Sequence, residues 1–153
     1  MADGYLVWKL LHIVGAMMML GNVVVTGAWA AILWRHRETG TPRQMARGIL
    51  WTDLVFTLGG GALLVIAGIE MIRLHQLPWR EMGWLLHGIE LLALATLVWV
   101  VVLLPDQLRM EEHADKDPER FARCFRRWTI VGWVDKALLV AALVLMVLRP
   151  GGG

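Results

Sequence analysis

The chain alternates long apolar stretches with short polar segments. Four stretches are long enough to cross a membrane, and they run over Tyr5–Trp34, Ile49–Ile72, Met82–Leu104 and Trp128–Leu148. About 20 helical residues cross roughly 30 Å of hydrocarbon, where a helix satisfies its own backbone hydrogen bonds. The pattern therefore predicts an all-α, polytopic membrane four-helix bundle of up-down topology, with residues 1–153 as a single transmembrane domain.

The polar segments carry signals for helix starts and stops. Thr41–Pro42 and Asp117–Pro118 each place an N-cap residue before a proline at the first helical position. We therefore expect the second and fourth helices to begin ahead of their apolar stretches, as basic amphipathic extensions. Pro105 is expected to bend or end the third helix, because proline lacks an N–H group and clashes with the preceding turn.

The basic residues are distributed unevenly among the connections. The first and third connections hold four and six Lys or Arg residues, whereas the second holds two and the C-terminal end holds one. Short connections rich in Lys and Arg stay in the cytoplasm. This asymmetry predicts that the first and third connections are cytoplasmic and that both termini lie outside.

The two halves of the chain resemble each other. Trp8 and Trp84 are 76 residues apart, and His12 and His87 are 75 residues apart. We interpret this spacing as a tandem helical-hairpin pseudo-repeat, with chance recurrence as the alternative. A repeated hairpin keeps its direction, so the two histidines are expected at similar depths, roughly 8–10 Å from the outer surface at 1.5 Å per residue.

Composition supports a membrane protein and excludes several other classes. The chain is 58% hydrophobic and 18% charged, against about 45–50% and about 25% in soluble domains. Cys124 is the only cysteine, so an intrachain disulfide is excluded. The net charge of +2 gives no reason to expect a nucleic-acid partner, and the lipid bilayer is the expected one. The sequence contains no phosphate-binding Gly-Lys loop, paired-cysteine motif or serine elbow.

Polar side chains within the apolar stretches are the candidates for chemistry, because such residues are costly in lipid. His12 and His87 are the candidate metal residues, as axial ligands of haem b. Lys9 and Glu90 lie one turn from them and suit propionates or substrate. Two glycines are expected to leave space nearby, and an asparagine continues the seam of His12. The candidate cofactor-binding residues are His12, His87, Lys9, Glu90, Gly15, Gly88 and Asn22.

Other interpretations of these residues stay open. Each histidine alone is also explained by a hydrogen bond that bridges two helices. Copper transport or delivery through His12, Met19 and His87 is the second hypothesis, since soft thioethers suit cuprous ions. The third is an accessory subunit of a larger membrane complex with its histidines only hydrogen-bonded.

Small and acidic residues near the second and fourth stretches allow fewer conclusions. Gly59–Gly61 permits close approach of a helix or a cofactor, and we expect close helix packing. Asp53 and Asp135 lie near the inner ends of their stretches, where proton transfer, helix capping and ion pairing are all open and pairing is favoured.

Several segments resemble known families. Tyr5–Gly15 resembles the opening helix of the CopD-like and HemJ-like small membrane proteins. Gly21–Thr26, Thr52–Thr57 and Arg127–Gly132 resemble a neighbouring bacterial family of predicted integral membrane proteins of unknown function. The similarity covers nearly the whole chain. It implies a four-helix, multi-pass protein of the bacterial inner (cytoplasmic) membrane.

The resemblance implies different activities through different relatives. HemJ-like proteins are haem-b-containing protoporphyrinogen oxidases, whose first-helix histidine would correspond to His12 and which use a basic residue on the third helix. Here the third stretch carries His87 and Glu90 and has no Lys or Arg in its core. CopD-like proteins are associated with copper handling.

The leading hypothesis is therefore a haem-b-binding membrane protein in electron transfer or a membrane redox reaction, with porphyrinogen oxidation as one such reaction. Whether the protein is an enzyme stays open. A quinone or a porphyrin would be the substrate, and a homodimer or a larger membrane complex the assembly.

Overall fold

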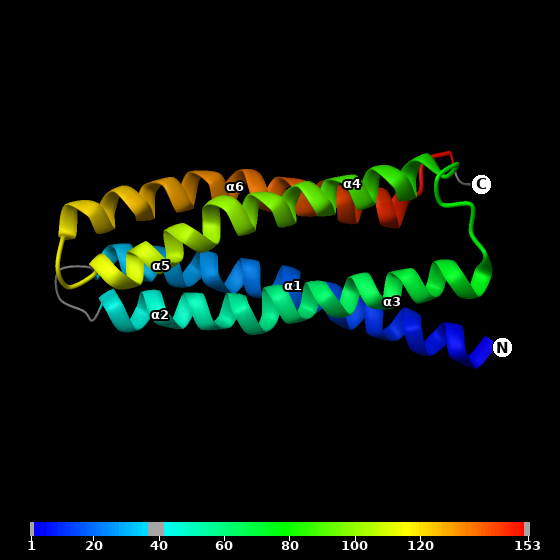
Figure 1. Cartoon of the computed structure of the whole chain (residues 1–153), viewed down its shortest axis with the longest axis horizontal. Coiled ribbons are helices and arrows are strands. Elements are labelled where there is room, and N and C mark those ends of the chain that lie inside the picture. The colour runs from blue at the N-terminus through cyan, green and yellow to red at the C-terminus, as the bar shows by residue number, and fades with distance from the viewer. Residues whose placement is uncertain (1, 37–41, 152–153) are drawn as a thin grey trace. The chain divides into compact units, whose positions relative to one another are not determined.

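The computed structural model describes residues 2–36 and 42–151, which form four long apolar helices (Figure 1). The segments in chain order are α1 (Ala2–Arg35), α2 (Pro42–Thr52), η1 (Asp53–Leu58), α3 (Gly59–His75), α4 (Gly83–Val98), η2 (Trp99–Leu103), α5 (Leu104–His113) and α6 (Pro118–Leu148). Two short π-helical segments, η1 and η2, lie within the second and third helices. The predicted all-α, four-helix membrane fold is confirmed.

The helices extend beyond the predicted apolar stretches. The second helix runs over Pro42–His75, the third over Gly83–His113 and the fourth over Pro118–Leu148. The second and fourth helices thus begin ahead of their apolar stretches, as predicted. Many large apolar side chains on all four helices are exposed, which suits a protein whose surrounding solvent is lipid.

The start of α6 has the predicted cap. The carboxylate of Asp117 accepts a hydrogen bond of 2.9 Å from the backbone N–H of Arg120, which would otherwise lack a partner in the first helical turn. The same N–H group lowers the pKa of Asp117 below its ordinary value, because it stabilises the charged carboxylate. The corresponding prediction for Thr41 falls outside the described residues.

The third helix continues past Pro105 instead of ending there. Pro105 lies in the first turn of α5, directly after η2, and α5 runs on to His113. Figure 1 shows α4, η2 and α5 as one continuous helix. In η2 the N–H of Leu104 bonds to the carbonyl of Trp99, five residues back. This wider turn adjusts the hydrogen-bond ladder just before a residue that cannot donate to it.

The chain divides into two compact units. The first contains α1 up to Trp29 together with Trp51–Pro78, and the second contains Ala30–Leu50 and the chain from Trp79 onwards. In the first unit, α1 packs closely against the second helix at two glycines, Gly15 and Gly60. A Cβ atom on Gly15 would lie 2.7 Å from the carbonyl oxygen of Gly60. One on Gly60 would lie 2.8 Å from the Cβ of Met18. The close packing predicted for the three consecutive glycines is confirmed at Gly60.

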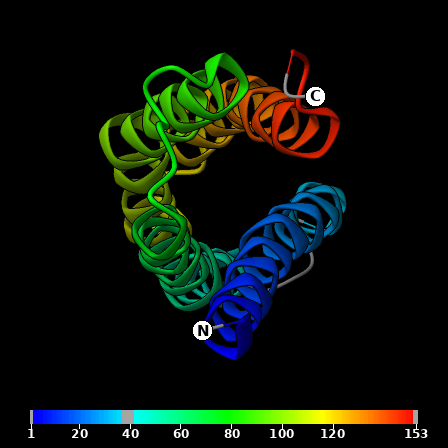
Figure 2. The ribbon, with the colours of Figure 1, turned by 90° about the vertical axis from the view of Figure 1, so that its right-hand side faces the viewer.

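In the second unit, α6 packs along α4, η2 and α5. Figure 2 shows α4 and α6 side by side when viewed along the helices. Where α1 ends, Trp34 stacks on Phe125 of α6 with ring centroids 5.0 Å apart, and Trp128 lies one turn further along α6. Phe125 and Trp128 are buried, so aromatic packing fixes α6 against the end of α1 within this unit.

Candidate functional site

His12 bridges α1 and α3 in the first unit. Its Nδ1 lies 2.8 Å from the carbonyl oxygen of Leu64. A carbonyl oxygen can only accept, so Nδ1 carries the proton and donates it. The ring lies beside Gly68, where a Cβ atom would come within 3.2 Å of the imidazole. The absence of a side chain at Gly68 therefore gives the ring its position against α3.

His87 has its oxygen partner on its own helix. Its Nδ1 lies 2.9 Å from Oε2 of Glu90, one turn further along α4. Both side chains are exposed, by 64% for His87 and 60% for Glu90, so neither is held by surrounding packing in the chain alone. An oxygen of the Glu90 side chain accepts, and Nδ1 of His87 donates.

The two imidazoles share one feature. Each donates from Nδ1 to an oxygen, so in the neutral ring the lone pair lies on Nε2. Among the residues that the structure describes, none forms a hydrogen bond or ion pair with Nε2 of either histidine. Metal-ligating histidines have this polarity, with one ring nitrogen donating to a carbonyl or carboxylate and the other facing the metal.

The other predicted site residues have different surroundings. The space expected beside Gly15 is filled by the backbone of Gly60 and Leu64, so this glycine serves helix packing. The space beside Gly88 is filled by the flexible side chain of Met146, whose Cε would lie 2.6 Å from an added Cβ. Lys9 is exposed on α1, one turn before His12.

Asn22 belongs to a buried polar cluster in the first unit. Its side-chain amide donates both hydrogens, one to Oδ1 of Asp53 and one to the hydroxyl of Thr57 at 2.9 Å. Asp53 is the first residue of η1, and π-helical turns are frequent at functional sites. Both Asn22 and Asp53 are buried. The sequence showed both residues as polar positions in apolar stretches but gave no sign that they meet.

A second buried carboxylate, Asp106, was missed by the sequence reasoning. It has no exposed surface and lies on α5 in the second unit. Arg127 of α6 binds it through two nitrogens, with Nε 2.7 Å from Oδ2 and Nη2 on Oδ1. Arg109 adds a contact of 3.3 Å to Oδ1. A fork of two N–H groups matches a carboxylate and compensates for its removal from water.

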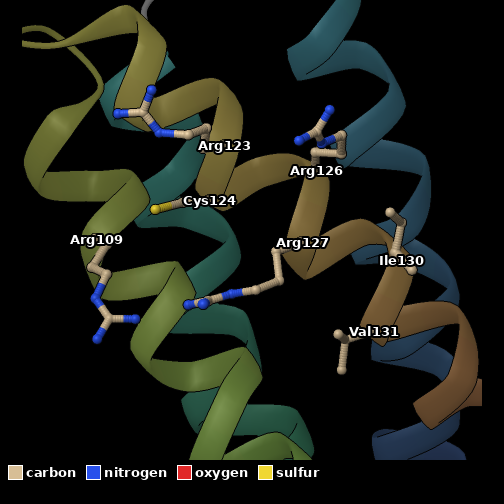
Figure 3. Close-up of a pocket in the computed structure, with 7 residues that line it drawn as sticks. All are labelled: Arg109, Arg123, Cys124, Arg126, Arg127, Ile130 and Val131. Atoms are coloured by element: carbon tan, nitrogen blue, oxygen red, sulfur yellow. The ribbon is translucent and has the colours of Figure 1, made fainter.

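A groove lies beside this ion pair, between α5 and α6. Its volume is about 660 Å³, and it is lined by Arg109, Arg123, Cys124, Arg126, Arg127, Ile130 and Val131. Figure 3 shows Arg123 and Arg126 on the part of α6 that precedes the two aliphatic residues, with the side chains of Arg109 and Arg127 on the side of α5. Arg127 reaches from α6 toward α5, where Arg109 begins. The sequence indicated these arginines only as basic residues of a connection.

A sequence model of the family described as predicted integral membrane protein (DUF2269) matches residues 6–150. Neither the curated proteins nor the solved structures give a match.

Proposed function

This chain belongs to the DUF2269 family of predicted integral membrane proteins, and we propose that it binds haem b and takes part in electron transfer or another membrane redox reaction. In this proposal His12 and His87 would hold the haem iron. The observation that carries it is the shared polarity of the two rings, with Nδ1 donating to an oxygen and Nε2 without a described partner.

The hydrogen bonds at Nδ1 fit this role for physical reasons. A bond from Nδ1 fixes the tautomer and the orientation of the ring, and it raises the basicity of the opposite nitrogen. The carboxylate of Glu90 has this effect on His87, and the Leu64 carbonyl has it on His12. Haem b, when bound, supplies one-electron chemistry, while these residues hold and orient it.

Two further residues support the assignment. Gly68 accommodates the His12 ring, so the position of this imidazole is set by backbone as well as by its hydrogen bond. Lys9 is exposed one turn before His12, and its ammonium group suits a propionate carboxylate. In this proposal Gly15 and Gly88 act by packing the helices, and Asn22 acts through its hydrogen bonds to Asp53 and Thr57.

Haem content tests the proposal. The full chain is purified with haem supplied during expression, and reduced-minus-oxidised and pyridine haemochrome spectra are recorded. We expect haem b in the wild type and its loss in the double variant His12→Ala with His87→Ala. The control is His113→Ala, which changes a histidine at the end of α5 outside the apolar stretches. Absence of haem from the wild type, or undiminished haem in the double variant, contradicts the proposal.

The contribution of Glu90 is measured with Glu90→Leu, which removes the acceptor of the His87 ring. Loss of such a partner commonly weakens binding about 10–100-fold. The control is Glu70→Leu, because Glu70 pairs with Arg73 rather than with a histidine. Equal haem affinity in the two variants would show that Glu90 does not contribute to haem binding, and only the two histidines would remain as proposed ligands.

Copper transport or delivery through His12, Met19 and His87 is the alternative proposal. The sulfur of Met19 lies 3.6 Å from where a Cβ on Gly61 would stand, so this thioether contacts the second helix in the first unit. Stoichiometric copper without haem in the purified protein would favour this function. A haem-containing protein that turns over protoporphyrinogen would be an oxidase. Stoichiometric partner chains with neither metal would instead favour an accessory subunit.

A further inference from the structure

The groove between α5 and α6 exposes four guanidinium groups to its surroundings. The side chains of Arg109, Arg123 and Arg127 are 52–61% exposed, and Arg126 is exposed as well. The hydrogen bonds to Asp106 therefore use only some of the N–H donors of Arg109 and Arg127. An arginine has five N–H donors, so both keep donors that point away from the carboxylate.

The local charge is positive after all described ion pairs are counted. Asp106 neutralises one charge shared between Arg109 and Arg127. Glu119 lies 3.7 Å from Arg123, in a pair whose carboxylate is 88% exposed and contributes little. Arg126 has no acidic partner among the residues that the structure describes. The groove thus presents unneutralised guanidinium groups, whose forked N–H donors match a carboxylate or a phosphate, and phosphate is the anionic group that phospholipids carry.

The other part of the groove is apolar. Ile130, which is 60% exposed, and Val131 line it one turn beyond Arg126 and Arg127. These two aliphatic residues belong to the apolar stretch Trp128–Leu148. Arg123, Arg126 and Arg127 directly precede the start of this stretch, where a membrane-spanning helix is expected to meet the lipid headgroups, and Ile130 and Val131 lie one turn further along α6 (Figure 3).

We propose that this groove binds an anionic phospholipid, with its phosphate on the arginines and the start of an acyl chain against Ile130 and Val131. The volume of about 660 Å³ is large enough for a headgroup with its glycerol. Basic pockets between transmembrane helices bind anionic headgroups in this way. A free phosphate would satisfy the arginines but would leave the aliphatic part of the groove unused. This site is independent of the proposed haem ligands.

Lipid retention by the purified full chain tests the proposal. Native mass spectrometry compares dioleoyl-phosphatidylglycerol with dioleoyl-phosphatidylcholine, each added to the detergent-solubilised protein. We expect the wild type to retain phosphatidylglycerol preferentially. The double variant Arg123→Gln with Arg126→Gln should weaken that retention about 10–30-fold, from the typical contribution of two basic residues near a membrane surface. Neither arginine contacts Asp106, so the buried ion pair stays intact.

The matched control is Arg73→Gln with Arg80→Gln, which removes two exposed arginines from the last turn of α3 and from the connection between α3 and α4. We expect it to retain phosphatidylglycerol like the wild type. Equal losses in the two double variants would show a general charge effect and overturn the proposal, as would equal retention of both lipids by the wild type.

A further arm separates a lipid from free phosphate. Ile130→Ser should weaken retention of phosphatidylglycerol, and millimolar inorganic phosphate should not displace this lipid from the wild type. Displacement by inorganic phosphate, with no effect of Ile130→Ser, would show that the groove takes the phosphate alone and would overturn the assignment to a lipid. Circular dichroism melting without added lipid confirms that each variant is folded.

Discussion

Gly15 shows how a missing side chain positions a functional one. Because Gly15 has no Cβ, the backbone of α1 can lie directly against Gly60 and Leu64 of α3. One turn before it on α1, His12 then reaches the carbonyl oxygen of Leu64. The hydrogen bond of the imidazole therefore depends on a helix contact that involves no side chain of Gly15 itself.

A methyl group at this position should be strongly unfavourable. In Gly15→Ala the new Cβ would lie 2.6–2.7 Å from backbone atoms of the second helix, which can move only if the helices separate. We expect a loss of about 1–3 kcal/mol in the free energy of unfolding and a lower Tm in detergent. The control is Gly21→Ala, whose Cβ would meet nothing within 4 Å. It should be neutral or slightly stabilising, since alanine favours the helix. Equal Tm values for the two variants would contradict this account.

At the residue scale, the sequence predicted which positions are important, but it was less successful in predicting what those residues contact. Gly15 was expected to leave space for a cofactor, and in the structure the other helix occupies that space. Asp106 gave no signal, because the guanidinium that pairs with it lies 21 residues later on another helix. Which residues become partners in such an ion pair depends on how two helices pack against each other. The polarity pattern along a single helix contains no information about that packing.

The starts and irregularities of the helices differ in how well the sequence predicts them. The Asp117–Pro118 start was predictable because capping is local, with donor and acceptor three residues apart. The π-helical segments were not predicted. Pro105 gives a physical reason for η2, since a proline interrupts the series of backbone hydrogen bonds in the helix. The sequence contains no comparable signal for η1.

The cap on α6 should depend on pH. The pKa of Asp117 is lowered in the folded chain by the N–H of Arg120, so its contribution is complete above the ordinary carboxyl pKa and is lost as the pH falls through the lowered value. Asp117→Ala should speed hydrogen exchange of the Arg120 amide severalfold at neutral pH, and wild type and variant should converge in acid. Asp117→Asn caps without titrating, and its protection should not vary across this range. If the hydrogen-exchange protection of the Arg120 amide still varied with pH in Asp117→Asn, a group other than Asp117 would be responsible for the pH dependence.

At the scale of the whole molecule, hydropathy was sufficient to predict four helices because lipid leaves few alternatives for a backbone. The predicted pseudo-repeat stays a prediction. The two hairpins differ in their contacts, since Gly15 meets Gly60 in the first unit and Gly88 meets Met146 in the second. Gly15 and Gly88 are 73 residues apart rather than 75 or 76, so they are not equivalent positions of the repeat and do not test it.

The orientation in the membrane is expected to follow the basic connections. On a Cys124→Ser background, Glu81→Cys marks the connection between α3 and α4, and Lys116→Cys marks that between α5 and α6. Both positions are exposed. In spheroplasts, a membrane-impermeant maleimide should label the Glu81→Cys variant directly and the Lys116→Cys variant only after permeabilisation. The opposite pattern, or labelling of both without permeabilisation, would contradict outward-facing termini.

The wide turn at η2 also determines the direction in which the side chains after it point around the axis of the third helix. A bond from Leu104 back to Trp99 accommodates one residue more than an α-helical turn would, and one residue corresponds to a rotation of about 100° around the axis. The direction in which Asp106 points, and hence its meeting with Arg127, is tuned by that single extra residue. A homologous chain shortened by one position between Trp99 and Leu103 would close this turn to a regular α-helical one and still direct its counterpart of Asp106 toward the guanidinium, whereas a deletion after η2, between Leu104 and Asp106, would rotate that carboxylate away from it.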